Sequence, residues 1–196
     1  MLKKWILVGA IALFATLLVW VVFFWQPDSA KPAAAPRSGD FTLRSAAGQL
    51  SLHDLRGKVV LLYFGYTLCP DICPTSLAFT AQGLAQLDAK ELEKVKMLFV
   101  TVDPERDTLE RLKDYTAYFH PSIVGLTGAP EEIARAAKLY GASYARQQVA
   151  SAAGYVIDHS ADTYLIAPDG SLYATLPHAT PPGSVAEKIR AALKLH

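Results

Sequence analysis

The chain contains two cysteines, Cys69 and Cys73, and three residues separate them. They belong to the segment CPDICP, residues 69–74, which follows an uncharged apolar run at residues 59–66 that predicts a buried strand. If a helix starts here, the two sulfurs lie at positions i and i+4, one above the other on one helix face. Because the thiolate is the form that binds metals and attacks disulfides, this pattern predicts either a soft-metal site or a redox-active dithiol.

The supply of ligands limits which metal such a site could hold. Structural zinc needs four Cys or His ligands, and a blue-copper site needs one Cys, two His and usually an axial Met. The two methionines are Met1 and Met97, and Met97 falls inside a second predicted buried strand. Two thiolates with one imidazole suit Cu(I). Thioredoxin-like redox enzymes use a Cys-x-x-Cys spacing, one residue shorter than here, and closing so short a loop as an inert disulfide adds little stability.

A third ligand would have to be a histidine, and His159 has the most supportive context. It stands beside Asp158, after a glycine-containing loop at residues 150–154 and just before a predicted strand at 163–167. Loops at strand ends often carry binding residues, and a neighbouring carboxylate can orient an imidazole. From the residues alone, a ligand and a packed core histidine are equally supported. His178 is the reserve candidate. The remaining histidines have no supporting context: His53, His120 and His196.

Helices alternate with strands along the part of the chain that carries these residues, and a hairpin comes late. This order predicts an α/β fold with a central mixed sheet flanked by helices. A dithiol that follows the first parallel strand and leads into a helix is typical of the thioredoxin-like fold. The expected elements are a hairpin at 41–55, strands at 59–66, 95–102 and 123–126, helices at 75–87, 108–119, 130–140 and 184–195, and a hairpin at 163–176 around Pro-Asp-Gly.

The loop DPERD, residues 103–107, leaves the second strand at the same edge as the cysteines. It could border the site or simply cap the next helix, and the sequence supports both interpretations equally. Tyr63, Phe64 and Tyr66 are expected to pack in the core. A peroxidase of related fold is disfavoured because Lys58 is the nearest basic residue before the cysteines.

The N-terminal segment predicts a membrane anchor. Residues 5–25 carry no charge over 21 positions, and a helix of that length spans about 30 Å, the thickness of the bilayer core. Lys3 and Lys4 precede it and should stay cytoplasmic, which places the rest of the chain on the far side. A cleaved signal peptide is the alternative, but its apolar region is normally only about 7–15 residues long.

We therefore expect three parts: a cytoplasmic stub and anchor at 1–25, a Pro/Ala-rich linker at 26–37 and one domain at 38–196. The linker QPDSAKPAAAPR contains three prolines and should be extended and semi-stiff.

The net charge of the whole chain is +1. Without Lys3 and Lys4 the chain has 17 basic and 18 acidic residues, which excludes the basic footprint of a nucleic-acid binder.

Three stretches together resemble the Sco/SenC family of membrane-tethered copper proteins, which act in assembly of the CuA centre of cytochrome c oxidase. They are YFGYTLCPDICP at 63–74, VDPERDT at 102–108, and DHS with YLIAPDG between 158 and 170. The resemblance extends from about Phe41 to the C-terminus. It implies a thioredoxin-like fold and a site for Cu(I) and Cu(II), with Cys69, Cys73 and His159 as the metal ligands.

The resemblance implies delivery of copper, or of reducing equivalents, to an oxidase subunit, and the function we expect is that of a copper metallochaperone. The expected partners are the copper-bearing subunit of cytochrome c oxidase, another copper chaperone and the membrane. The expected location is the cell inner membrane, with a single pass and the C-terminal domain in the periplasm. The alternative function is a thiol–disulfide oxidoreductase that reduces the copper-site cysteines of the oxidase subunit, with Cys69 and Cys73 as its redox-active pair.

Overall fold

The computed structural model describes residues 13–14, 16–18, 20, 38–150 and 154–195, and the chain divides into two compact units, residues 1–33 and 34–196. The described residues of the first unit are helical, and their apolar side chains are exposed. Within the described part of the chain, no helix is both long enough and apolar enough to cross a membrane. Most of the expected anchor at 5–25, and all of the expected linker at 26–37, lie outside the described residues.

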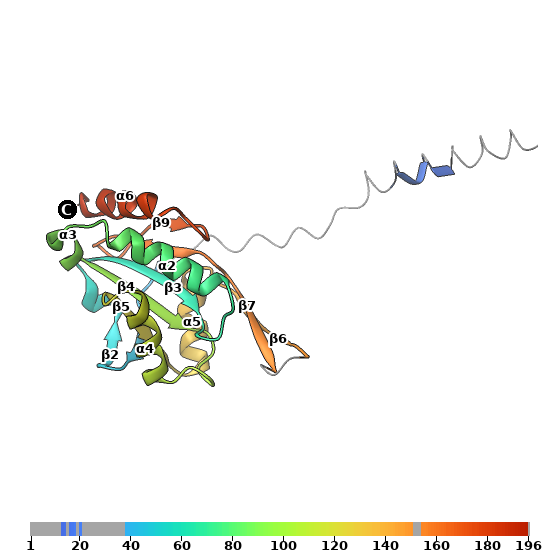
Figure 1. Ribbon diagram of the computed structural model, residues 1–196, viewed down its shortest axis with the longest axis horizontal. Helices are drawn as coiled ribbons and strands as arrows, with labels where there is room; N and C mark the ends of the chain where they lie inside the picture. The colour runs from blue at the N-terminus through green and yellow to red at the C-terminus, as the bar shows by residue number, and fades with distance from the viewer. Residues whose placement is uncertain (1–12, 15, 19, 21–37, 151–153, 196) are drawn as a thin grey trace, which may run out of the picture. The chain divides into compact units, whose positions relative to one another are not determined.

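A five-stranded mixed sheet forms the centre of the second unit, in the order β5-β4-β3-β8-β9 (Figure 1). Strands β3 (Val59–Gly65), β4 (Val95–Thr101) and β5 (Ile123–Leu126) are parallel. Strands β8 (Thr163–Ile166) and β9 (Leu172–Leu176) form the late hairpin, and β8 pairs antiparallel with β3. Every residue of β3 is buried, as a continuous apolar run predicts. The expected α/β fold with a mixed central sheet is confirmed.

Three helices, α2 (Ile72–Leu84), α4 (Leu109–Phe119) and α6 (Pro182–Leu193), lie on one face of this sheet. The connections β3-α2-β4 and β4-α4-β5 step in the same direction across the sheet, and right-handed crossovers then place both helices on the same face. Helix α6 packs against α2. Helix α5 (Pro130–Leu139) lies on the other face. The hairpin of β1 (Thr42–Ser45) and β2 (Gly48–Ser51) contacts β5, α4 and α5 through β1.

The alternation of side chains along β3 fills both faces of the sheet. Tyr63 stacks on Phe99 of β4, which contacts Tyr115 of α4. Phe64 points the opposite way and contacts Tyr164, on the face where α5 packs. The core prediction for the aromatic residues of β3 is confirmed.

Three elements differ from the sequence prediction. Helix α3 (Ala89–Glu93) was not expected; it begins at a capping box formed by Asp88 and Glu91. Strands β6 (Tyr144–Gln148) and β7 (Tyr155–His159) form a separate antiparallel hairpin that was not expected; the sequence indicated only a loop at residues 150–154. Strand β6 is mostly exposed and polar, so it lacks the apolar pattern that marks a strand.

Candidate metal centre

The two cysteines reach the site from different local structures. Helix α2 begins at Ile72, so Cys73 lies in its first turn, whereas Cys69 lies in the turn before it. The Cys69 N–H donates to the Tyr66 carbonyl at 3.2 Å, which folds this turn back toward the end of β3. Only Cys73 therefore lies on the helix, so the condition for stacking both sulfurs on one helix face is not met. Pro74 occupies the first turn of α2, where a missing N–H costs nothing.

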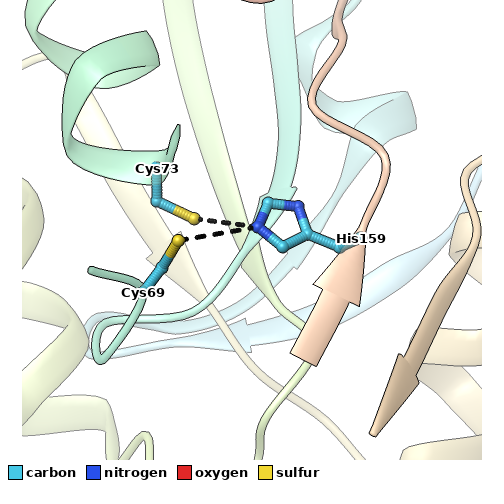
Figure 2. Close-up of side chains that lie close together, drawn as sticks. All are labelled: Cys69, Cys73 and His159. Carbon is cyan, nitrogen blue, oxygen red and sulfur yellow. Dashed lines mark hydrogen bonds between the residues drawn. The ribbon is translucent and has the colours of Figure 1, made fainter. Parts of the chain in front are cut away.

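His159 ends β7 and points its ring at both sulfurs (Figure 2). Its Nε2 lies 3.2 Å from the Cys73 Sγ and 3.9 Å from the Cys69 Sγ. The three potential ligand atoms all lie within 4.8 Å of one another. The ring Nδ1 lies 2.9 Å from the Ser160 carbonyl, which can accept a hydrogen bond from it, so Nε2 is the ring nitrogen that faces the sulfurs.

Two tyrosines hold the His159 ring in place. The rings of Tyr63 and Tyr66 meet it nearly edge-on, with centroids 6.0 and 5.8 Å away. Both tyrosines are buried, so the core role predicted for them is confirmed. Their contact with a candidate ligand was not foreseen, because the sequence cannot tell which core side chains face the site.

Gly65 gives the Cys73 sulfur room to lie against the end of β3. A Cβ atom added at Gly65 would stand 2.6 Å from the Cys73 Sγ and 2.9 Å from the Tyr63 ring. Gly65 was not predicted to be a site residue. A glycine inside a buried strand is nevertheless a recognised signal that another group approaches the backbone closely.

The two thiols are ionised unequally. The hydrogen bond from Cys73, with a further one from His159, lowers the pKa of Cys69 to about 4 against the opposing effect of burial. Burial, and then the neighbouring Cys69 sulfur, raise the pKa of Cys73 well above its ordinary value. Cys69 is 8% exposed and Cys73 is 0% exposed. The fold therefore favours the thiolate at Cys69, which lines a cavity, and the neutral thiol at Cys73.

The loop at residues 103–107 borders the site, which decides the question that the sequence left open. Asp107 is 1% exposed and accepts hydrogen bonds from the Thr67 N–H at 3.0 Å, the Thr67 hydroxyl at 2.5 Å and the Thr101 hydroxyl at 2.6 Å. Thr67 lies two residues before Cys69. Thr108 caps the N-terminus of α4. Asp107 instead holds the turn before Cys69 through its hydrogen bonds with Thr67.

The same loop also contacts the strand that carries His159. Arg106 donates through its Nε to the buried carboxylate of Asp103 and through a second nitrogen to the Tyr155 carbonyl at 3.1 Å. Its guanidinium lies 3.6 Å from the centroid of the Tyr155 ring. The Tyr155 hydroxyl donates to Asp103 at 2.8 Å.

The other candidate histidines lie apart from this cluster. His178 is exposed, and its Nδ1 is 2.9 Å from the Ser76 hydroxyl. His120 accepts from the Ser122 N–H through Nδ1, and burial lowers its pKa. His53 belongs to the short helix after β2, and His196 lies outside the described residues.

A cavity of about 290 Å³ opens beside Cys69. Its lining combines the tyrosine and histidine of the cluster with apolar and acidic side chains from the cysteine turn and from β7: Tyr66, Cys69, Pro70, Asp71, Ile72, Val156, Ile157, Asp158 and His159. A partner molecule could therefore approach the Cys69 sulfur and the imidazole from the same side.

Comparison with known proteins identifies the family. The model of the SCO1/SenC family matches residues 29–194. The bovine protein described as "Protein SCO2 homolog, mitochondrial" is 44% identical over 147 residues, 74% of this chain and 55% of its own length. The chain thus spans about half the length of the curated relatives it matches.

Solved structures agree with this match. Bradyrhizobium japonicum ScoI with copper bound is 35% identical, with a TM-score of 0.73 over 80% of this chain and 99% of that chain. BsSco, described with a disulfide switch and as a member of the Sco family of cytochrome c oxidase assembly proteins, is 26% identical, with a TM-score of 0.63 over 86% of this chain and all of that one. With its mixed sheet and its Cys-Cys-His cluster, this chain belongs to the SCO1/SenC family.

Proposed function

We propose that this protein is a copper metallochaperone in which Cys69, Cys73 and His159 bind the metal as cargo. The convergence of two sulfurs and one imidazole nitrogen within 4.8 Å carries the proposal. Soft thiolates select Cu(I) over harder ions, and imidazole also suits copper. The Ser160 carbonyl, which holds the His159 Nδ1, supports Nε2 as the donor atom.

The acceptor that we propose is the copper-bearing subunit of cytochrome c oxidase, with another copper chaperone as the donor. The assembly role printed for BsSco supports this choice. Three protein ligands leave copper open to an incoming ligand, and the cavity beside Cys69 gives an acceptor side chain access. Transfer can then proceed by exchange of one ligand at a time.

We further propose that residues 5–25 anchor the protein in the cell inner membrane by a single pass, with residues 38–196 in the periplasm. The support is the run of 21 uncharged residues after Lys3 and Lys4. Residues 26–37 would then be a spacer that lets the domain reach a membrane-bound acceptor.

A competition titration with a Cu(I) chelator tests the ligand set. Cys69→Ser, Cys73→Ser and His159→Ala should each weaken copper binding, and the two serine variants should lose the most because thiolates dominate Cu(I) binding. His178→Ala is the matched control, since it removes an imidazole outside the cluster and should leave affinity unchanged. A variant that keeps wild-type affinity would remove its residue from the ligand set.

The unequal thiols support a second function, reduction of a partner disulfide. The Cys69 thiolate attacks one partner sulfur and forms a mixed disulfide while the other partner sulfur leaves as a thiolate. Cys73 then gives its proton to the released partner thiolate and attacks the Cys69 sulfur, so that the second partner sulfur also leaves as a thiolate. The products are a Cys69–Cys73 disulfide and a reduced partner, so two electrons pass to the partner.

A metal-free single-turnover assay separates the two functions. The reduced protein is mixed with an oxidised peptide that carries the two copper-site cysteines of the oxidase subunit. Thiol transfer that needs both cysteines but survives His159→Ala would support the reductase. If the peptide stays oxidised, the reductase proposal fails and the metallochaperone proposal is unaffected.

A further inference from the structure

The hairpin that carries His159 is joined to the body of the domain by few backbone hydrogen bonds. Strands β6 and β7 pair only with each other among the strands that the structure describes. In Figure 1 the hairpin extends away from the central sheet. The position of His159 relative to the sulfurs therefore depends on side chains that hold β7 against the domain.

The alternation of β7 places the residues that make this attachment on the same face as His159. Tyr155, Ile157 and His159 occupy positions i, i+2 and i+4 of the strand. The Ile157 N–H donates to the Tyr66 hydroxyl at 3.2 Å. Tyr155 is held by Arg106 through its carbonyl and its ring, and by Asp103 through its hydroxyl.

Arg106 is the centre of this attachment because it contacts both the loop at residues 103–107 and strand β7. Its Nε side is fixed by Asp103, a carboxylate that is 1% exposed, and its other nitrogen reaches β7. A planar guanidinium can satisfy a carboxylate and a carbonyl together, and it can also stack on an aromatic ring. The next residue, Asp107, fixes the cysteine turn through Thr67. One short loop thus fixes both halves of the cluster.

We propose that Arg106 is a positioning residue that holds His159 on the copper through Tyr155, and that loosening this contact is the step that opens the copper for transfer. The proposal rests on the proposed copper function. When β7 moves away, the bond from copper to His159 Nε2 breaks and a bond to an acceptor thiolate forms. Copper stays on the Cys69 and Cys73 thiolates throughout, and its oxidation state does not change.

Arg106→Lys is the first test, because lysine keeps a charge beside Asp103 but cannot contact the carboxylate and the Tyr155 carbonyl as one planar fork. The full-length protein is loaded with Cu(II) or with Cu(I), and affinity is measured by competition with a chelator of each ion. We expect Cu(II) affinity to fall about 10–100-fold, the range typical when a partner that orients a metal ligand is lost. Cu(I) affinity should fall less, because two thiolates can still bind it.

A double-variant comparison separates positioning from general destabilisation. If Arg106 acts through His159, adding Arg106→Lys to the His159→Ala variant should lower Cu(II) affinity almost no further. The Cu(II) absorption and EPR spectra of Arg106→Lys should also shift toward those of His159→Ala. Glu110→Gln is the matched control, because Glu110 is exposed in the first turn of α4.

Tyr155→Phe provides a second variant should Arg106→Lys fail to fold, since it removes only the hydroxyl that donates to Asp103. Additive losses in the double variant, or a wild-type Cu(II) spectrum in both single variants, would overturn the positioning role. Faster copper release to the chelator from either single variant supports the transfer step, and an unchanged release rate overturns it. If the wild-type protein binds no copper, the proposed copper function itself fails. That result differs from a failure of the Arg106 proposal, in which the wild-type protein still binds copper.

Discussion

Cys69 and Cys73 have the same side chain but different pKa values, because the fold directs hydrogen bonds to the Cys69 sulfur and buries Cys73 more deeply. The hydrogen bonds that stabilise the Cys69 thiolate come from Cys73 and His159. The buried Cys73 cannot also ionise without placing a second negative charge beside the first. The site therefore starts from one thiolate, and copper loading must displace the Cys73 proton.

Alkylation of the reduced, metal-free protein by iodoacetamide should show this asymmetry. A pKa of about 4 means that Cys69 is a thiolate above that pH, so its rate should be flat at neutral pH and fall only as pH drops through about 4. An ordinary thiol loses reactivity below about pH 8.5. Cys73 should react little because it is buried.

Cys73→Ser is the informative control for this titration. It replaces the thiol that contributes most to the low pKa of Cys69 with a hydroxyl group. The pH midpoint of the Cys69 alkylation rate should therefore shift. Mass spectrometry of tryptic peptides identifies the modified residue. A wild-type midpoint above pH 7 would contradict the described hydrogen bonding.

Gly65→Ala should disturb the site more than the fold. The new methyl group would stand 2.6 Å from the Cys73 Sγ, so the sulfur must move. Overpacking of this kind costs about 1–3 kcal/mol of unfolding free energy, and copper affinity should fall with it. Chemical denaturation and a chelator titration measure the two effects. Gly183→Ala is the control, because a Cβ there meets no atom within 4 Å; equal losses in both variants would contradict a specific role for Gly65.

The sequence predicted the site residues that have distinctive chemistry and missed those that act by shape. Cys69 and Cys73 could be recognised from their type and spacing, and His159 from its neighbours and the family resemblance. Gly65, Tyr66 and Arg106 have no such signature, since their roles depend on which atoms the fold brings within contact distance. The buried strand that ends in a glycine was the one available signal.

At the scale of elements, the loop at residues 103–107 links two segments that are far apart in the sequence. Asp107 holds the turn before Cys69, and Arg106 holds β7. The sequence could place this loop at the right edge of the sheet, because the carboxyl ends of parallel strands meet there. It could not show the β6–β7 hairpin, whose exposed strand is polar, although the alternation of Tyr155, Ile157 and His159 is a strand signal.

Asp107→Asn should loosen the cysteine turn. The amide offers one acceptor oxygen instead of two to the three donors from Thr67 and Thr101. A buried donor left without a partner costs about 1–3 kcal/mol, so unfolding free energy should fall by that order. Cu(I) affinity should also fall, because Cys69 is less well held.

Asp114→Asn is the matched comparison, since Asp114 is exposed on α4. It should leave both denaturation and Cu(I) binding unchanged. A stable Asp107→Asn protein with wild-type affinity would show that the turn before Cys69 holds its shape without this carboxylate.

At the scale of the whole molecule, the sequence predicted the main layers correctly because the central strands are long apolar runs and the crossover rules leave few arrangements. The structure adds that one face of the sheet contributes to the metal site, whereas the other face only packs in the core. Tyr63 points toward the site from the face of α2 and α4, while Phe64 packs on the opposite face. Substitutions on the second face should therefore affect stability before they affect copper.

The proposed anchor makes the last prediction, which concerns the full-length chain. After an alkaline carbonate wash, the protein should stay in the membrane pellet if residues 5–25 span the bilayer. Leu13→Arg combined with Leu17→Arg places two charges near the centre of this segment, and each costs about 2.5–3.5 kcal/mol on insertion, so the variant should appear in the soluble fraction. Tyr118→Arg is the control, because Tyr118 is 85% exposed on α4 and should not change the partitioning. Recovery of the wild-type protein in the soluble fraction would exclude the uncleaved anchor, and with it the tether that we propose brings the copper site to its acceptor.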